Sequence, residues 1–138
     1  MKGILIFFAL TLSPLAFSQT AGKCKTLDEL IRKISSKKRY NFSSVNKIYN
    51  LNRTLKCDGA YAEGMSNIVV QALVMDYVRT LKVAGKTQSA TDFVLSHIAA
   101  IADKAYLVKV VDNSMKICPR NKKELCKKIE TEARKGIK

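Results

Sequence analysis

Hydrophobic residues recur at helical spacing along almost the whole chain. The first such stretch covers residues 26–35, and it opens with Thr26 and Glu29 at the spacing of a capping box. A second stretch begins at Ser43 or Ser44, either of which suits the N-cap position, and it runs to Leu55. The pattern therefore predicts two consecutive amphipathic helices in the first half of the chain.

The longest apolar pattern covers Ala60–Val83 and predicts a third helix. Its β-branched residues do not alternate with polar ones, so a strand is not indicated. A helix that is apolar over so much of its circumference lies at the centre of a bundle or also serves a contact between molecules. We expect a homodimer in which the same face of this helix meets from both subunits. The expected interface residues are Met65, Val69, Leu73 and Tyr77.

Helical spacing continues through the second half of the chain. Gly85 has the character of a residue that ends a helix, and Ser89 or Thr91 is expected to cap the next one. The helical pattern that follows continues to residues 112–114, where a break in the helix is expected. Asn121 is expected to cap the last helix. There is no internal repeat and no linker. We predict a single all-α domain, a helical bundle of five or six helices.

The N-terminus has the pattern of a secretory signal peptide. Lys2 precedes the apolar run Ile4–Leu12, Pro14 ends it, and Ala16-Phe17-Ser18 supplies the small residues of a cleavage site. The run is too short to span a bilayer, so we expect no membrane anchor. The predicted division is a signal peptide at residues 1–18 and a mature domain at residues 19–138.

An exported chain changes the interpretation of the cysteines. Four cysteines in a short secreted protein indicate two disulfides. If the first two helices form an antiparallel hairpin, Cys24 and Cys57 lie at the same end, which favours a Cys24–Cys57 bond. A chain that folds back over the turn before the last helix brings Cys118 near Cys126. The other plausible set, Cys57–Cys118 with Cys24–Cys126, stays open.

Composition argues against an enzyme. The 138 residues are 47% hydrophobic and 26% charged, which is typical of a folded domain. His97 is the only histidine, so a His-based zinc site or a pair of histidines is excluded. No motif for a nucleophile accompanies it, and we expect it to be a packed or interfacial side chain. We expect no catalytic residue, no metal and no cofactor.

The chain is strongly basic, with 25 Lys and Arg against 11 Asp and Glu and a net charge of +14. Such clusters can bind nucleic acid, but export argues against that partner. Their ordinary explanation is a solvated helix face, and an acidic protein or an anionic lipid stays open. The clusters are Arg32-Lys33, Lys37-Lys38-Arg39, Lys116 with Arg120, Lys122-Lys123 and Lys127-Lys128.

Two short motifs resemble a known family. Cys57-x-Gly59-x-Tyr61-x-x-Gly64 opens a helix, and Cys118-Pro119 precedes a final amphipathic helix. Together with the signal peptide and the helical pattern, these residues resemble the immunity proteins of bacterial type VI secretion, in particular the amidase-immunity (Tai) group and the related resistance-associated immunity proteins. The resemblance covers about residues 24–135. Ala60 stands between Gly59 and Tyr61, where the family often has Gly-Tyr, and Cys126 lies further from the C-terminus than is usual.

The resemblance implies a function. Such proteins lie in the periplasm and occlude the active site of an injected peptidoglycan amidase, a papain-like enzyme with a Cys–His site. They are often homodimers, and the complex with the enzyme can be a heterotetramer. Two alternatives from other classes stay open: a secreted basic helical protein that binds anionic lipid, of the antimicrobial type, and a small exported hydrolase that uses His97.

An inhibitor that occludes a cleft needs an element that protrudes from its helical frame. The polar connection Gly85–Ser89 lies between two strong helices, and its fixed ends lower the cost of ordering it. We expect Lys86 to reach acidic groups beside the cleft and Thr87, Gln88 and Ser89 to bond its polar walls. A plain connector is the ordinary alternative. The basic turn Ser36–Tyr40 is the second candidate.

Overall fold

The structure is a computed structural model that describes residues 15–57, 59–101 and 103–138. These residues form seven α-helices and one short 3-10 helix, and no strand occurs among them, which confirms the all-α class. The number of helices exceeds the predicted five or six. The elements are α1 (Leu15–Ser36), α2 (Phe42–Leu55), α3 (Ala60–Met75), α4 (Tyr77–Ala84), α5 (Gln88–Ala99), α6 (Lys104–Lys116), η1 (Arg120–Lys122) and α7 (Lys123–Ile137).

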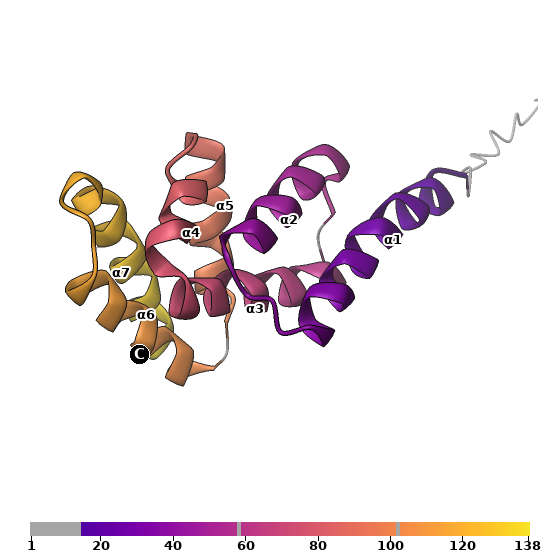
Figure 1. The fold of residues 1–138 in the computed structure, drawn as a ribbon. Helices are drawn as coiled ribbons and strands as arrows, with labels where there is room; N and C mark the ends of the chain where they lie inside the picture. Colours follow the sequence, from indigo (N-terminus) through magenta and orange to yellow (C-terminus); the bar gives the residue numbers. More distant parts are fainter. Residues whose placement is uncertain (1–14, 58, 102) are drawn as a thin grey trace, which may run out of the picture.

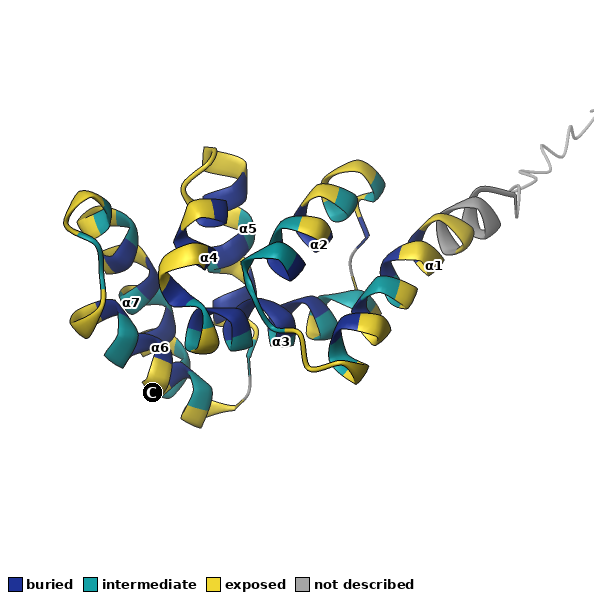
Figure 2. Ribbon diagram, viewed as in Figure 1, coloured by how far each residue is buried: buried dark blue, intermediate teal, exposed yellow. Residues whose placement is uncertain are grey.

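The helices form a row of pairs with α3 passing across it (Figure 1). The pairs are α1 with α2, α4 with α5, and α6 with α7, and α3 packs against α1, α2, α4, α5 and α6. Buried residues line the surfaces between the helices, and exposed residues cover the outside (Figure 2). The position of α3 explains why it is apolar on nearly every side, because neighbouring helices cover most of its circumference.

Helix α1 begins well before the predicted start at Thr26. Thr26 and Glu29 lie inside it, so the predicted capping box is wrong. Cys24 is buried and continues the apolar face of Leu27 into the preceding turn, which the pattern from residue 26 onwards does not include. Residues 1–14 of the predicted signal peptide lie outside the described residues, and residues 15–18 form the start of α1.

The start of α2 also differs from the prediction. Asn41, rather than Ser43 or Ser44, is its N-cap, and the Asn41 side chain accepts a hydrogen bond from the amide of Ser44 at 3.1 Å. Ser44 is buried, and its hydroxyl donates to the Arg39 carbonyl at 2.5 Å. Asparagine is at least as good an N-cap as serine, and the extended backbone at position 41 decides between them.

The predicted long helix is broken at Asp76, between α3 and α4. The Asp76 backbone leaves the helical region, while its carboxylate accepts a hydrogen bond from the amide of Phe42 at 3.1 Å. In an unbroken helix the carbonyls of Leu73 and Val74 accept from amides four residues on. Here the side-chain amide of Asn113 donates to both, at 3.0 and 3.1 Å. A residue of α6 thus satisfies carbonyls at the end of α3.

The second break lies between α5 and α6, not near residues 112–114. Asp103 caps α6, because its side chain accepts from the Ala105 amide at 2.9 Å. Ser114, in the region of the expected break, is buried within α6. The predicted cap of the last helix is likewise wrong, since Asn121 lies in η1 and no side chain caps α7.

Both disulfides of the favoured pairing are present, Cys24–Cys57 and Cys118–Cys126. Asn52 supports the first, because its side chain accepts from the amide of Cys57 at 3.1 Å. Gly64, part of the family-like motif, allows α1 and α3 to approach closely. A Cβ atom at Gly64 would lie 2.7 Å from Cγ2 of Ile31, inside any normal contact distance.

None of the helices in the described segments combines the length with the apolar character that crossing a bilayer requires.

Candidate functional site

The predicted partner-binding connection is the turn between α4 and α5. Gly85, Lys86, Thr87, Gln88 and Ser89 are all exposed. The turn is shorter than the predicted connection, because α5 already begins at Gln88. Thr87 is the N-cap, and its hydroxyl accepts from the Ala90 amide at 3.1 Å, so Ser89 and Thr91 are not the cap.

Side-chain contacts fasten this turn to its neighbours. The Lys86 ammonium donates to Oδ1 of Asn46 at 2.8 Å, and the hydroxyls of Thr87 and Tyr49 lie 3.3 Å apart. Both contacts lead to α2. Hydrogen bonding with Ser89, and then with Thr87, lowers the pKa of the Tyr49 phenol. The turn is therefore an exposed polar surface that is held in one position by α2.

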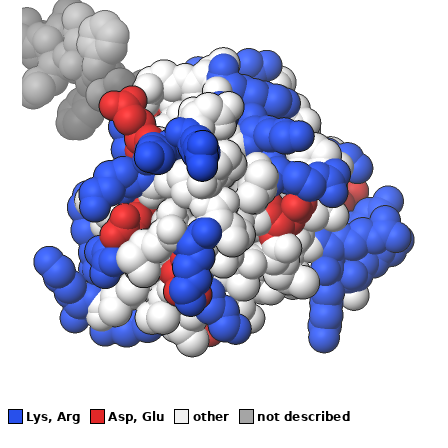
Figure 3. All heavy atoms as spheres, turned by 60° about the vertical axis from the view of Figure 1, so that its left-hand side comes forward, with Lys and Arg blue, Asp and Glu red and all other residues white. Residues whose placement is uncertain are grey.

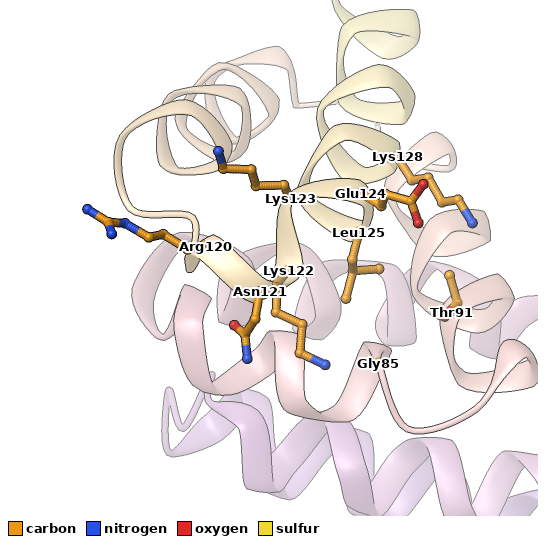
Figure 4. A pocket seen from close by; sticks show the side chains of 9 residues that line it. All are labelled: Gly85, Thr91, Arg120, Asn121, Lys122, Lys123, Glu124, Leu125 and Lys128. Atoms are coloured by element: carbon orange, nitrogen blue, oxygen red, sulfur yellow. The ribbon is translucent and has the colours of Figure 1, made fainter.

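A cavity of about 380 Å³ lies beside the turn (Figure 4). The turn and α5 supply one side of it, and η1 with the first turns of α7 supply the other. Its lining residues are Gly85, Thr91, Arg120, Asn121, Lys122, Lys123, Glu124, Leu125 and Lys128.

Gly85 ends α4 as predicted, but without the left-handed backbone typical of a glycine at that position. Its φ of −89° is open to any residue, so it is not a left-handed helix terminus. A Cβ atom at this position would lie 2.8 Å from the Lys122 ammonium nitrogen. The glycine thus leaves room for Lys122 to extend over the turn, as Figure 4 shows. Thr91, on the same side of the cavity, donates its hydroxyl hydrogen bond to the Ala84 carbonyl at 2.7 Å.

On the face that carries α6 and α7, lysine and arginine side chains are more widespread than acidic ones, with uncharged surface between them (Figure 3). Four of the residues that line the cavity are cationic, and Glu124 is the only carboxylate among them. The sequence showed these charges as clusters along the last helix. It did not show that η1 and α7 pack beside the α4–α5 turn, and so the cavity was missed.

The expected interface residues of the third helix are not on the surface. Met65, Val69, Leu73 and Tyr77 are 0–2% exposed within the single chain. They are core residues that offer no surface to a second subunit, and this corrects the expectation. The pattern was ambiguous between a central and an interfacial helix, and the contacts of α3 with the surrounding helices resolve it.

His97 is a packed side chain. Its Nδ1 lies 2.8 Å from the hydroxyl oxygen of Ser66, and its ring meets the ring of Phe93 edge-on at 4.5 Å. Burial lowers the pKa of His97 to about 4. Ser66 is fully buried, and the pair joins α5 to α3.

The second candidate turn, Ser36–Tyr40, joins α1 to α2, away from the α4–α5 turn (Figure 1). Lys37, Lys38 and Arg39 are exposed there, and Lys38 has a left-handed backbone with φ of 47°. The structure does not bring the two candidate turns together.

Comparison of the chain with family models, with curated proteins and with solved structures finds no match. The resemblance to the immunity proteins therefore rests on the residues of the two motifs, Cys57–Gly64 and Cys118-Pro119, and on the pattern around them.

Proposed function

We propose that this protein is an immunity protein of bacterial type VI secretion. In this proposal, residues 1–18 direct export, and the domain binds a secreted peptidoglycan amidase in the periplasm and occludes its active-site cleft. The producer cell is thereby protected. The inhibitor itself performs no reaction and uses neither a metal nor a cofactor.

The observation that carries the proposal is the α4–α5 turn. The turn and the start of α5 together present five consecutive exposed residues, and contacts to Asn46 and Tyr49 of α2 hold the turn in place. A surface that is ordered before binding loses little conformational entropy on binding, as a tight inhibitor requires. The two disulfides add support, because such bonds persist in oxidising compartments such as the periplasm.

The test replaces the exposed side chains of the turn and keeps the Thr87 cap. For the variant Lys86→Ala/Gln88→Ala/Ser89→Ala we expect the affinity for the cognate amidase to fall by more than about tenfold, or about 1.4 kcal/mol. The measurement is titration calorimetry, together with the rate of peptidoglycan hydrolysis. The melting temperature should stay close to that of the wild type, since Thr87 still caps α5.

The matched control changes three residues of the other turn, Ser36→Ala/Lys37→Ala/Arg39→Ala. We expect its affinity for the amidase to match that of the wild type. If both variants bind the amidase with the same affinity, the inhibitory element does not lie in the α4–α5 turn. If the wild-type protein does not bind an amidase encoded by a neighbouring gene, the proposed function is wrong.

The basic face in Figure 3 favours one second candidate, a secreted protein that binds anionic lipid. Leakage of vesicles rich in phosphatidylglycerol, caused by the purified protein alone, would select that function over the first.

A further inference from the structure

The cavity beside the α4–α5 turn is suited to a negatively charged side chain. Figure 4 shows Lys122 extending towards Gly85, while Lys128 lies beside Glu124 further along α7, above Thr91. The half-buried side chain of Leu125 lies between them. The cavity thus offers two separate ammonium groups with an apolar side chain between them. Arg120 and Lys123 extend outwards from the rim of the cavity.

Among the described residues, no carboxylate lies within ion-pair distance of the four cations that line this cavity. The cations that pair with a carboxylate in the described residues are Arg32, Lys116, Lys127, Arg134 and Lys135. None of these lines the cavity. Like charges gathered in a concave site repel one another and raise the local potential, and a bound anion relieves that repulsion.

The first turn of α7 adds to the positive potential. Lys123, Glu124 and Leu125 belong to that turn, and no side chain caps the helix. The partial positive charge at the N-terminal end of a helix favours an anion nearby. This contribution has the same sign as that of the lysines and supports a site that they define.

We propose that this cavity binds an acidic segment of a partner protein, with one Glu or Asp carboxylate at Lys122, another at Lys128, and their methylene groups against Leu125. The inference rests on the proposed function in one respect, that the partner is the amidase. Gly85 belongs both to the cavity and to the exposed turn, so one partner can contact both. A recessed site suits a side chain better than the plane of a membrane, because Lys122 is half-buried.

The first experiment needs no amidase. Hexaglutamate is titrated into the isotope-labelled protein, and the backbone amide signals of Lys123, Glu124 and Leu125 are followed by NMR. For Lys122→Gln/Lys128→Gln we expect peptide affinity about tenfold below that of the wild type. The control Lys33→Gln/Lys37→Gln removes the same charge near the α1–α2 turn, and its affinity should stay within about twofold of the wild type, as expected for remote surface charges.

A variant that binds hexaglutamate more tightly serves as a second test, because misfolding can only weaken binding. Glu124 is the only carboxylate that lines the cavity, so Glu124→Gln should bind hexaglutamate more tightly than the wild type. Absence of peptide-induced shifts at residues 123–125, equal weakening in both lysine variants, or no gain for Glu124→Gln would each overturn the proposal.

Two further measurements separate this inference from the proposed function. Lys122→Gln/Lys128→Gln should weaken binding of the cognate amidase, and the Lys33/Lys37 control should not. A wild type that binds hexaglutamate at the cavity but no amidase overturns the proposed function alone. Binding to phosphatidylglycerol vesicles that depends on Lys122 and Lys128, with no binding of hexaglutamate, overturns the acidic segment in favour of lipid headgroups.

Discussion

His97 shows how the setting of a single residue decides its chemistry. The side chain is 8% exposed, is hydrogen-bonded to Ser66 and packs against Phe93. Burial disfavours the charged imidazolium and lowers the pKa of His97 from an ordinary 6.5 to about 4. Folding therefore favours the neutral ring over the whole range between these two values.

This burial predicts an acid-sensitive contribution to stability. Between pH 6.5 and pH 4 the unfolded state binds a proton at His97 that the native state does not, so stability falls as the pH falls. The pKa difference corresponds to a loss of about 3 kcal/mol between pH 7 and pH 4. The measurement is urea unfolding at a series of pH values.

The variant His97→Gln isolates this contribution, because an amide can bond Ser66 and does not titrate. Carboxylates elsewhere titrate alike in both proteins, so the relevant quantity is the difference between the two stability curves. We expect that difference to change by about 3 kcal/mol between pH 7 and pH 4. If the two curves of stability against pH are parallel, protonation of His97 costs no more free energy in the native state than in the unfolded state.

At the scale of the helices, the break at Asp76 depends on Asn113. Its side-chain amide satisfies two carbonyls at the end of α3, while the Asp76 carboxylate holds the start of α2. We expect Asn113→Ala to lower the free energy of unfolding by about 1–3 kcal/mol, because two part-buried carbonyl groups lose their donor. Denaturant unfolding monitored by circular dichroism measures the change.

Asn50 provides a control for the same substitution. It is exposed on α2, so Asn50→Ala should alter stability by no more than about 0.5 kcal/mol. If Asn113→Ala is as mild as Asn50→Ala, water replaces the lost donor and the bridge contributes little.

The sequence predicted most helices and both disulfides, and the misses have physical causes. Apolar spacing continues through Asp76, so the local sequence does not indicate that the helix breaks there. The break is stabilised by the side chain of Asn113, which is distant in sequence. Competing cap residues are decided by backbone angles, which selected Thr87 over Ser89. The cavity depends on η1 packing beside Gly85, a contact between distant segments. The local hydrophobic pattern therefore predicts that the helices exist. The residues at which they end, and the cavity, depend on tertiary packing.

For the whole molecule, the expected homodimer needs a surface other than the buried face of α3. Met75, Val78 and Ile117 are 65%, 43% and 48% exposed. Each is close in sequence to the junction of α3, α4 and α6, where the Asn113 side-chain amide donates to the Val74 carbonyl at 3.1 Å and the Tyr77 hydroxyl donates to the Ser114 hydroxyl at 2.8 Å. Large exposed apolar side chains of this kind are residues that a protein contact would cover.

We expect a dimer to use this junction. Met75→Ser/Ile117→Ser should give a monomeric mass in light scattering at micromolar concentration, because the contact loses its apolar area. Val108→Ser, at a side chain 53% exposed elsewhere on α6, should leave the mass unchanged. A wild-type monomer would contradict the homodimer, and a dimer that survives the double variant would place its contact elsewhere.

The two disulfides join cysteines that are consecutive in the sequence, Cys24 to Cys57 and Cys118 to Cys126. A chain that crosses a membrane with its N-terminus leading presents these thiols to the oxidising side in the same order. The first pair can close before the third cysteine emerges, and of the three possible pairings only the native one follows that order. For the exported protein that we propose, the direction of translocation itself selects the correct bonds, and oxidative folding has no need of a disulfide isomerase.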